Sequence, residues 1–163
     1  MKNKITHKAY NRSKKGGFTL IEILVVLGIL AILATLVLVA VNPGRQFKMA
    51  RDTKRAANVA TILNSISQNI SDHGGSFICD GSITPLPATT TPIGSGSGEF
   101  NLAECVVPDY ISALPYDPGI EDSHYTNEAD YATHYGVSTD TEGRVTVSAT
   151  GELADNSEIT ATR

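Results

Sequence analysis

The stretch KKGGFTLIE, residues 14–22, opens a long apolar part of the chain. From Phe18 to Val41 the sequence runs for 24 residues with Glu22 as its only charged residue. A helix of that length reaches roughly 36 Å, which exceeds the roughly 30 Å of a bilayer's hydrocarbon core. The sequence therefore predicts a membrane-spanning helix over residues 18–41, with one carboxylate near its start that needs an explanation.

Charge is unevenly distributed around this apolar segment. Residues 1–17 contain six basic side chains and no acid, which places the N-terminus in the cytoplasm by the positive-inside rule. A second basic segment, here called the basic collar, covers residues 45–55 and contains Arg45, Lys48, Arg51, Lys54 and Arg55. From residue 56 onward the chain has 15 acidic residues and two arginines. An acidic head of this kind is unsuited to binding nucleic acid, because phosphates need cations.

The basic collar has three interpretations. We favour a surface that faces solvent or lipid headgroups. The alternatives are contact with the acidic heads of neighbouring copies and, less favoured, direct binding of DNA.

The apolar segment is not an ordinary secretory signal. Such signals have an apolar stretch of about 7–15 residues followed by an A-x-A-like cleavage site. The present stretch is longer and no such site follows it. No cysteine lies near residue 20, which argues against a lipoprotein signal.

Residues 42–75 are predicted to form an amphipathic helix after a Pro43-Gly44 interruption, which we interpret as a kink rather than a helix end. His73-Gly74-Gly75 is expected to end this helix. An apolar stripe is predicted from Val59, Ile62, Leu63, Ile66 and Ile70, with Ala56, Ala57 and Ala60 filling it. The opposite, solvent-facing side is predicted to carry Asp52, Thr53, Asn58, Ser65 and Asn69.

Residues 76–163 are predicted to form an extracytoplasmic head with antiparallel strands. Alternating residues predict strands over 131–138 and 144–149, joined by a turn at 139–143, and residues 158–162 suit a third strand. The Thr-, Pro- and Gly-rich stretch 81–98 is expected to be an exposed loop. The fold class is therefore α+β, with one very long helix followed by a small antiparallel sheet.

Cys79 and Cys105 bracket the 81–98 loop. If both face an oxidising compartment they are expected to pair, which stabilises the fold by about 3 kcal/mol in the chain-entropy model. The alternative is two unrelated reduced thiols.

Gly16-Gly17 followed by Phe18-Thr19-Leu20-Ile21-Glu22 resembles the class III signal of type IV pilins and pseudopilins. The resemblance implies that residues 1–17 are a leader, that a prepilin peptidase cuts between Gly17 and Phe18, and that Phe18 is then N-methylated. It also implies that Glu22 meets the new amine of a neighbouring subunit and sets the register of a helical filament. A carboxylate near a membrane core is costly and is usually paired or functional, which agrees with that role.

The same resemblance implies partners and a location. They are other copies of the chain, the prepilin peptidase, an inner-membrane platform protein, an assembly ATPase, and membrane lipid before assembly. The chain would first cross the cell membrane once and then join an extracellular or periplasmic filament, in which residues around Pro43 and Gly44 lose helical hydrogen bonds.

Leu114-Pro115-Tyr116-Asp117-Pro118 resembles the LPxDP segment of many pseudopilins. Major pseudopilins continue with Trp-Gly and a calcium loop, whereas this chain continues with Gly119-Ile120-Glu121-Asp122. Oxygen ligands suit Ca²⁺, and the candidate ligands are Asp117, Glu121, Asp122 and Asp130. Acidic loops exposed to solvent are the commoner explanation of such a set.

Catalysis has no clear basis in the sequence. The histidines are scattered, and neither H-E-x-x-H nor G-x-S-x-G occurs. We therefore expect a structural subunit without a cofactor, calcium aside. The alternatives are a pseudopilin of a type II secretion system and a monomeric membrane-anchored binding protein.

Overall fold

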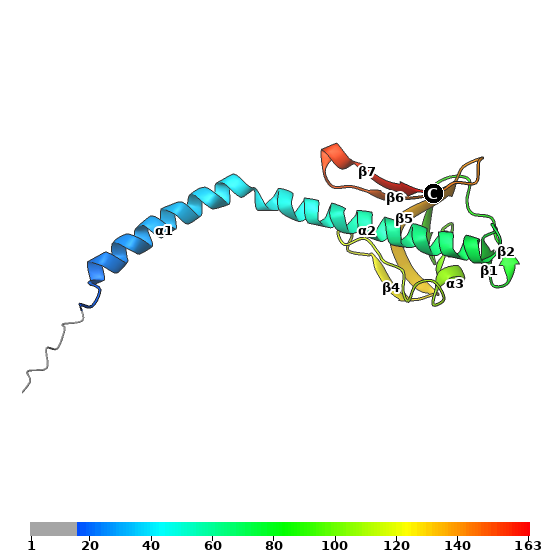
Figure 1. Cartoon of the computed structure of the whole chain (residues 1–163), viewed down its shortest axis with the longest axis horizontal. Coiled ribbons are helices and arrows are strands. Elements are labelled where there is room, and N and C mark those ends of the chain that lie inside the picture. The colour runs from blue at the N-terminus through cyan, green and yellow to red at the C-terminus, as the bar shows by residue number, and fades with distance from the viewer. Residues whose placement is uncertain (1–15) are drawn as a thin grey trace, which may run out of the picture. The chain divides into compact units, whose positions relative to one another are not determined.

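The computed structural model describes residues 16–163 and divides the chain into two compact units, one ending at Asn42 and the other covering Pro43–Arg163 (Figure 1). Residues 1–15, and with them most of the predicted leader, lie outside the described residues. The predicted α+β fold is confirmed: an apolar helix is followed by a second helix and an antiparallel sheet.

Helix α1 (Leu20–Val41) forms the first unit. Among the described residues, one helix is long and apolar enough to cross a membrane, over Leu20–Leu38. Its apolar side chains contact no core within the chain and are exposed throughout this span. The helix stops at Asn42, which adopts a left-handed conformation with φ of 43°. Such an apolar surface requires either lipid or other protein around it.

Helix α2 (Pro43–Asp72) begins with proline at its first position, where the missing N–H costs no helical hydrogen bond. The interruption therefore lies at Asn42, and Pro43 and Gly44 are both helical. At the other end Gly74 has φ of +64°. The Gly75 N–H donates to the Ile70 carbonyl at 2.8 Å, and the Gly74 N–H donates to Ser71 at 3.4 Å. This Schellman arrangement ends the helix where the glycine pair predicted it.

The predicted faces of α2 are partly wrong. Val59, Ile62, Leu63 and Ile66 are buried as expected, but Ala56, Ala57 and Ala60 are exposed. The buried face also includes polar residues that were expected in solvent or in the basic collar, namely Asp52, Arg55, Asn58, Ser65 and Asn69. A polar side chain can be buried when its hydrogen bonds are satisfied, and the head supplies partners that helical periodicity does not reveal.

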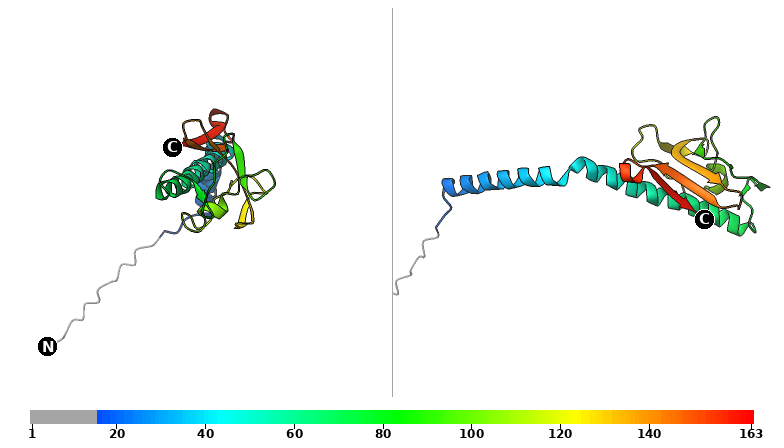
Figure 2. Two further views of the ribbon diagram at one scale, coloured as in Figure 1. Left: turned by 90° about the vertical axis from the view of Figure 1, so that its right-hand side faces the viewer. Right: turned by 90° about the horizontal axis from the view of Figure 1, so that it is seen from above.

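The sheet lies along α2 (Figure 2) and contacts it through β6 (Val145–Thr150) and β7 (Glu158–Thr162). The strand order is β3-β5-β6-β7, where β3 is Thr91–Gly94 and β5 is Asp130–Thr139, and β4 (His124–Asn127) also pairs with β5. All pairs are antiparallel. The three predicted strands are confirmed, and the alternate residues Val145, Val147 and Ala149 face the core.

The stretch 81–98 is not wholly an exposed loop. It contains β2 (Ser82–Ile83), which pairs with β1 (Ile78–Cys79), and β3 (Thr91–Gly94), which joins the main sheet. Ile93 of β3 is 1% exposed. Its carbonyl accepts a hydrogen bond of 2.7 Å from the buried Thr133 hydroxyl.

The predicted disulfide between Cys79 and Cys105 is confirmed, and it joins β1 to the short helix α3 (Ala103–Val106). Asn69 of α2 holds both segments, because its side-chain amide donates to the Ile78 and Cys105 carbonyls and its oxygen accepts from the Ile78 N–H. A three-residue 3₁₀ turn, Ala154–Asn156, precedes β7.

Candidate functional site

The junction between Gly17 and Phe18 lies just before α1 in non-helical chain. Gly16 and Gly17 are exposed, and an added Cβ on either would meet no atom within 4 Å. Phe18 is 82% exposed. A peptidase therefore has access to an exposed, non-helical backbone at this bond without unwinding a helix.

Thr19 and Glu22 form a capping box at the start of α1. The Glu22 N–H donates to Thr19 Oγ1 at 3.3 Å, and the Thr19 N–H donates to Glu22 Oε2 at 3.2 Å. This reciprocal arrangement satisfies donors that a helix start leaves without partners. It also holds the carboxylate of Glu22 at the positive end of the helix dipole. The Thr-x-x-Glu spacing is a sequence signature of such a cap, so Thr19 is predictable from the sequence although it was not among the predicted site residues.

The box brings Glu22 to the place where cleavage would create a charge. A cut after Gly17 makes Phe18 the first residue, and its amine then lies one residue before the Thr19 cap. A carboxylate and an ammonium group are thereby placed at the same end of one apolar helix. Such a helix end has opposite charges for pairing either within a subunit or between subunits.

Residues 12–38 match the family model described as the prokaryotic N-terminal methylation motif. The chain carries the N-terminal motif of type IV pilin and pseudopilin precursors. The matched residues of this pilin-like precursor end inside α1, so the motif covers the end of the predicted leader, the predicted cleavage junction and most of the apolar helix. No curated protein and no solved structure is significantly similar to the precursor.

The motif has direct implications for the pilin-like precursor. It implies processing by a prepilin peptidase and assembly into a filament. The apolar helix α1, most of which the motif covers, is consistent with membrane anchoring. The pilin family is structural rather than enzymatic.

A second polar site lies inside the head of the precursor and is centred on Arg55. Its side chain is 3% exposed and forms two hydrogen bonds of 2.7 Å with the Asp117 carboxylate. Arg55 Nη1 also donates to Asp52 and to Glu152, each at 2.8 Å. The guanidinium of Arg51 also binds Glu152. We call Arg51, Asp52, Arg55, Asp117 and Glu152 the Arg55 network.

Backbone groups complete the Arg55 network. The N–H groups of Glu152 and Leu153 donate to Asp52, and the Gly119 N–H donates to Asp117 at 2.7 Å. A Cβ on Gly119 would lie 2.6 Å from Arg55 Nη2, so any larger residue there would have to displace the guanidinium. The network therefore fastens α2 to the 117–119 turn and to the segment before β7.

This arrangement corrects the interpretation of the basic collar. Arg55 is buried in the head, and the half-buried Arg51 binds the Glu152 carboxylate, so neither is a free cation facing solvent or lipid. Lys48 and Lys54 are exposed as expected. Arg45 is also exposed, with Asp155 at 3.7 Å.

The candidate calcium ligands do not come together. Asp117 is bound by Arg55, whereas Asp130 accepts a hydrogen bond of 3.2 Å from His124, which lies on β4. Within residues 16–163 no group of three or more metal-ligating side chains is placed to hold a metal ion. Calcium binding by Asp117, Glu121, Asp122 and Asp130 stays a prediction, and the fit of these residues to it is poor.

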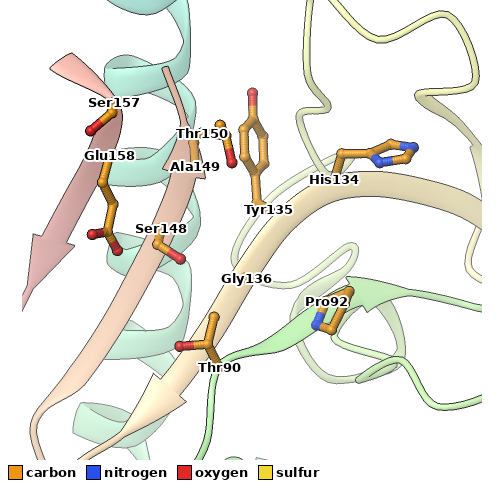
Figure 3. A pocket seen from close by; sticks show the side chains of 10 residues that line it. All are labelled: Thr90, Pro92, His134, Tyr135, Gly136, Ser148, Ala149, Thr150, Ser157 and Glu158. Atoms are coloured by element: carbon orange, nitrogen blue, oxygen red, sulfur yellow. The ribbon is translucent and has the colours of Figure 1, made fainter. Parts of the chain in front are cut away.

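A groove crosses the sheet between β5, β6 and β7, with Thr90 and Pro92 at one side (Figure 3). Its lining is mostly small and polar, with Ser148, Thr150 and Ser157 among its hydroxyl groups. The histidine and the carboxylate of the lining, His134 and Glu158, lie on opposite sides of the groove in Figure 3. The groove thus does not bring together an acid and a base, and we assign it no chemistry.

The Arg55 network keeps its carboxylates ionised. Hydrogen bonds from Arg51 and Arg55 lower the pKa of Glu152 to about 2, against the opposing effect of burial. Burial raises the pKa of Asp117, but hydrogen bonds from Arg55 and Gly119 outweigh it and leave the pKa below its usual value. For Asp52, burial is likewise outweighed by hydrogen bonds from Glu152 and Arg55, and the pKa is lowered.

We expect the head to lose stability in acid because of these three carboxylates. A group whose pKa is lower in the folded chain stabilises the fold above its unfolded pKa, and that stability is lost as pH falls through the folded pKa. The melting temperature, followed by circular dichroism, should stay level above about pH 5 and fall by at least about 5 °C between pH 4.5 and 2. Glu152→Gln should lower it at pH 7 and flatten the acid decline. An equal acid decline in Glu152→Gln would contradict this origin.

Proposed function

We propose that the chain is a structural subunit of a type IV pilus-like filament. A prepilin peptidase cuts between Gly17 and Phe18, and the new Phe18 amine is methylated. The processed subunit then leaves the membrane and docks through α1, with the carboxylate of Glu22 pairing with the amine of a neighbouring subunit.

The observation that carries this proposal is the placement of Glu22. It is the only charged residue of an apolar helix that has no core of its own to cover, and its capping box lies directly after the Gly17–Phe18 junction. A membrane anchor alone needs no carboxylate there, because a charge in this position is costly. A stack of identical helices does need a polar contact that fixes their register, since apolar contacts between such helices are weakly directional.

The rest of the proposal follows from the two units. Before assembly, lipid surrounds α1, the N-terminus is cytoplasmic, and the head lies outside the cytoplasm, where its disulfide is stable. During assembly, contacts between α1 helices replace contacts with lipid. A platform protein and an assembly ATPase supply the force that extracts the subunit from the membrane. The acidic head then forms the outer surface of an extracellular or periplasmic filament.

We expect the cellular protein to begin at a methylated Phe18. Intact-mass measurement with N-terminal sequencing should show loss of residues 1–17 and the added mass of one methyl group. Gly17→Val should leave the precursor uncut, because a branched side chain beside the cut does not fit a peptidase site that accepts glycine. Gly28→Ala, a change inside exposed α1, should not affect cleavage. Recovery of the wild-type chain with its leader intact would contradict the proposal.

A second candidate function is a pseudopilin of a type II secretion system. It is favoured by the LPxDP segment, whose Leu114 is 2% exposed and whose Asp117 binds Arg55. Electron microscopy with antibody labelling separates the two roles. Long surface fibres containing the chain favour the pilin, and a secretion defect without fibres upon deletion favours the pseudopilin.

A further inference from the structure

The first turns of α2 present an exposed apolar and cationic surface. Phe47 is 66% exposed, and Lys54 lies seven residues further on, two turns along the same side of the helix. Lys48, next to Phe47, is exposed as well. In the part of the chain that the structure describes, neither lysine forms an ion pair. We call Phe47, Lys48 and Lys54 the basal surface of α2.

Four exposed acids gather at the other end of α2, where Figure 1 shows β1, β2 and α3. Asp72 is the last helical residue and, with Asp109, lies beside Tyr110. Asp80 follows Cys79 and Glu104 precedes Cys105 in the sequence, so the disulfide between the two cysteines brings the backbones of these two acids close together. Within residues 16–163 none of the four has an ion-pair partner. We call Asp72, Asp80, Glu104 and Asp109 the acidic end.

The two arginines that follow residue 56 do not neutralise the acidic end. Arg144 binds Asp140 and Glu142 in the β5–β6 turn, and Arg163 binds the Asn64 side chain. The four acids also lie near the C-terminus of α2, whose dipole adds negative potential. Within the described part of the chain, none of the four acids is paired with an arginine or a lysine of the same molecule.

Distance prevents the basal surface from reaching the acidic end of its own molecule. From Lys48 to Asp72 the helix spans about 36 Å, so the two surfaces lie at opposite ends of α2. Opposite charges at opposite ends of one rigid unit suit a head-to-tail contact between copies. Such a contact uses two different patches and, when it does not close into a ring, continues as a filament.

We propose that the basal surface of α2 docks against the acidic end of a second copy. This inference rests on the proposed filament function and adds to it a contact outside α1. Lys48 and Lys54 meet the acids, which gives the contact its direction, and Phe47 buries its ring between the two copies. Charge complementarity of this kind steers association and rejects wrong orientations.

Charge reversal tests the contact in the full chain. Lys48→Glu with Lys54→Glu should reduce filament yield at least about fivefold, because like charges then face each other. Adding Asp80→Lys and Glu104→Lys should restore the yield, since the charges are exchanged rather than lost. Adding Glu121→Lys and Glu128→Lys is the matched control: both are exposed acids outside the acidic end, and this change should not restore assembly.

Two further measurements keep the result interpretable. Leader cleavage and the melting temperature should be unchanged in all variants, because the substituted side chains are exposed. Wild-type yield with Lys48→Glu and Lys54→Glu would overturn this contact while leaving the filament function in place. A loss that neither acid exchange restores would also overturn it, and would indicate that the lysines face anionic lipid. A processed wild-type chain that never self-associates would overturn both the contact and the filament.

Discussion

Replacing Glu22 with alanine is expected to abolish filament assembly while leaving the cut between Gly17 and Phe18 intact. The cut acts on an exposed, non-helical junction that does not involve the carboxylate. The proposed assembly does involve it, because an ammonium group that leaves water without a partner is costly. Removing one partner of a buried ion pair costs about 3–5 kcal/mol, which weakens each docking step by more than about a hundredfold.

Thr35→Ala is the matched control for Glu22→Ala. Thr35 is the other polar side chain within α1, but its hydroxyl donates to the Ala31 carbonyl of its own helix at 2.7 Å and has no role in register. Mass spectrometry should show the mature N-terminus for both variants, and electron microscopy should show filaments for Thr35→Ala only. Normal filaments from Glu22→Ala would contradict the role of this carboxylate. A monomeric membrane-anchored binding protein is the alternative that predicts such tolerance.

The features that the sequence predicted well are those that depend on local pattern. The apolar run after Phe18 gives α1 because no other structure can satisfy its backbone in lipid. Strands β5 and β6 follow from strict alternation, since Tyr131 and Tyr135 face the core on one and Val147 on the other. The glycine pair after Asp72 ends α2 by its backbone freedom.

The features that were missed depend on partners far away in the sequence. Strand β3 has one core residue, Ile93, in a stretch rich in threonine and proline, and it is a strand because β5 supplies its hydrogen bonds. Arg55 reads as part of a basic segment, yet its partners Asp117 and Glu152 lie 62 and 97 residues away. No spacing rule links such residues, and only the folded sheet brings them to α2.

The same distinction applies to the candidate site. Gly17, Phe18 and Glu22 belong to one contiguous motif, so the sequence alone was enough to predict a cut there, and that cut stays a prediction. The Thr-x-x-Glu spacing also predicts the Thr19 cap. By contrast, Asp117 was read as a candidate calcium ligand because it lies among other acids. In the fold it binds Arg55, and charge density along the chain did not reveal this partner.

Arg55→Ala is expected to lower the free energy of unfolding of the head by about 3–5 kcal/mol. The substitution leaves Asp52 and Asp117 buried without their shared cation, and an unpaired buried charge is far more costly than the loss of a surface pair. The exposed pair of Arg144 with Asp140 provides the control, and Arg144→Ala should cost no more than about 1 kcal/mol.

Urea unfolding of the full chain in detergent micelles measures this effect, followed by the near-ultraviolet circular dichroism of tyrosine. The chain has no tryptophan and α1 has no tyrosine, so the buried Tyr131 and Tyr135 report on the head without interference from the apolar helix. A double-mutant cycle with Asp117→Asn then isolates the central pair. The two changes should be strongly non-additive, because either one alone disrupts the same contact. Additive losses would mean that Arg55 stabilises the head through packing of its side chain, and that α2 is held to the sheet by its apolar stripe alone.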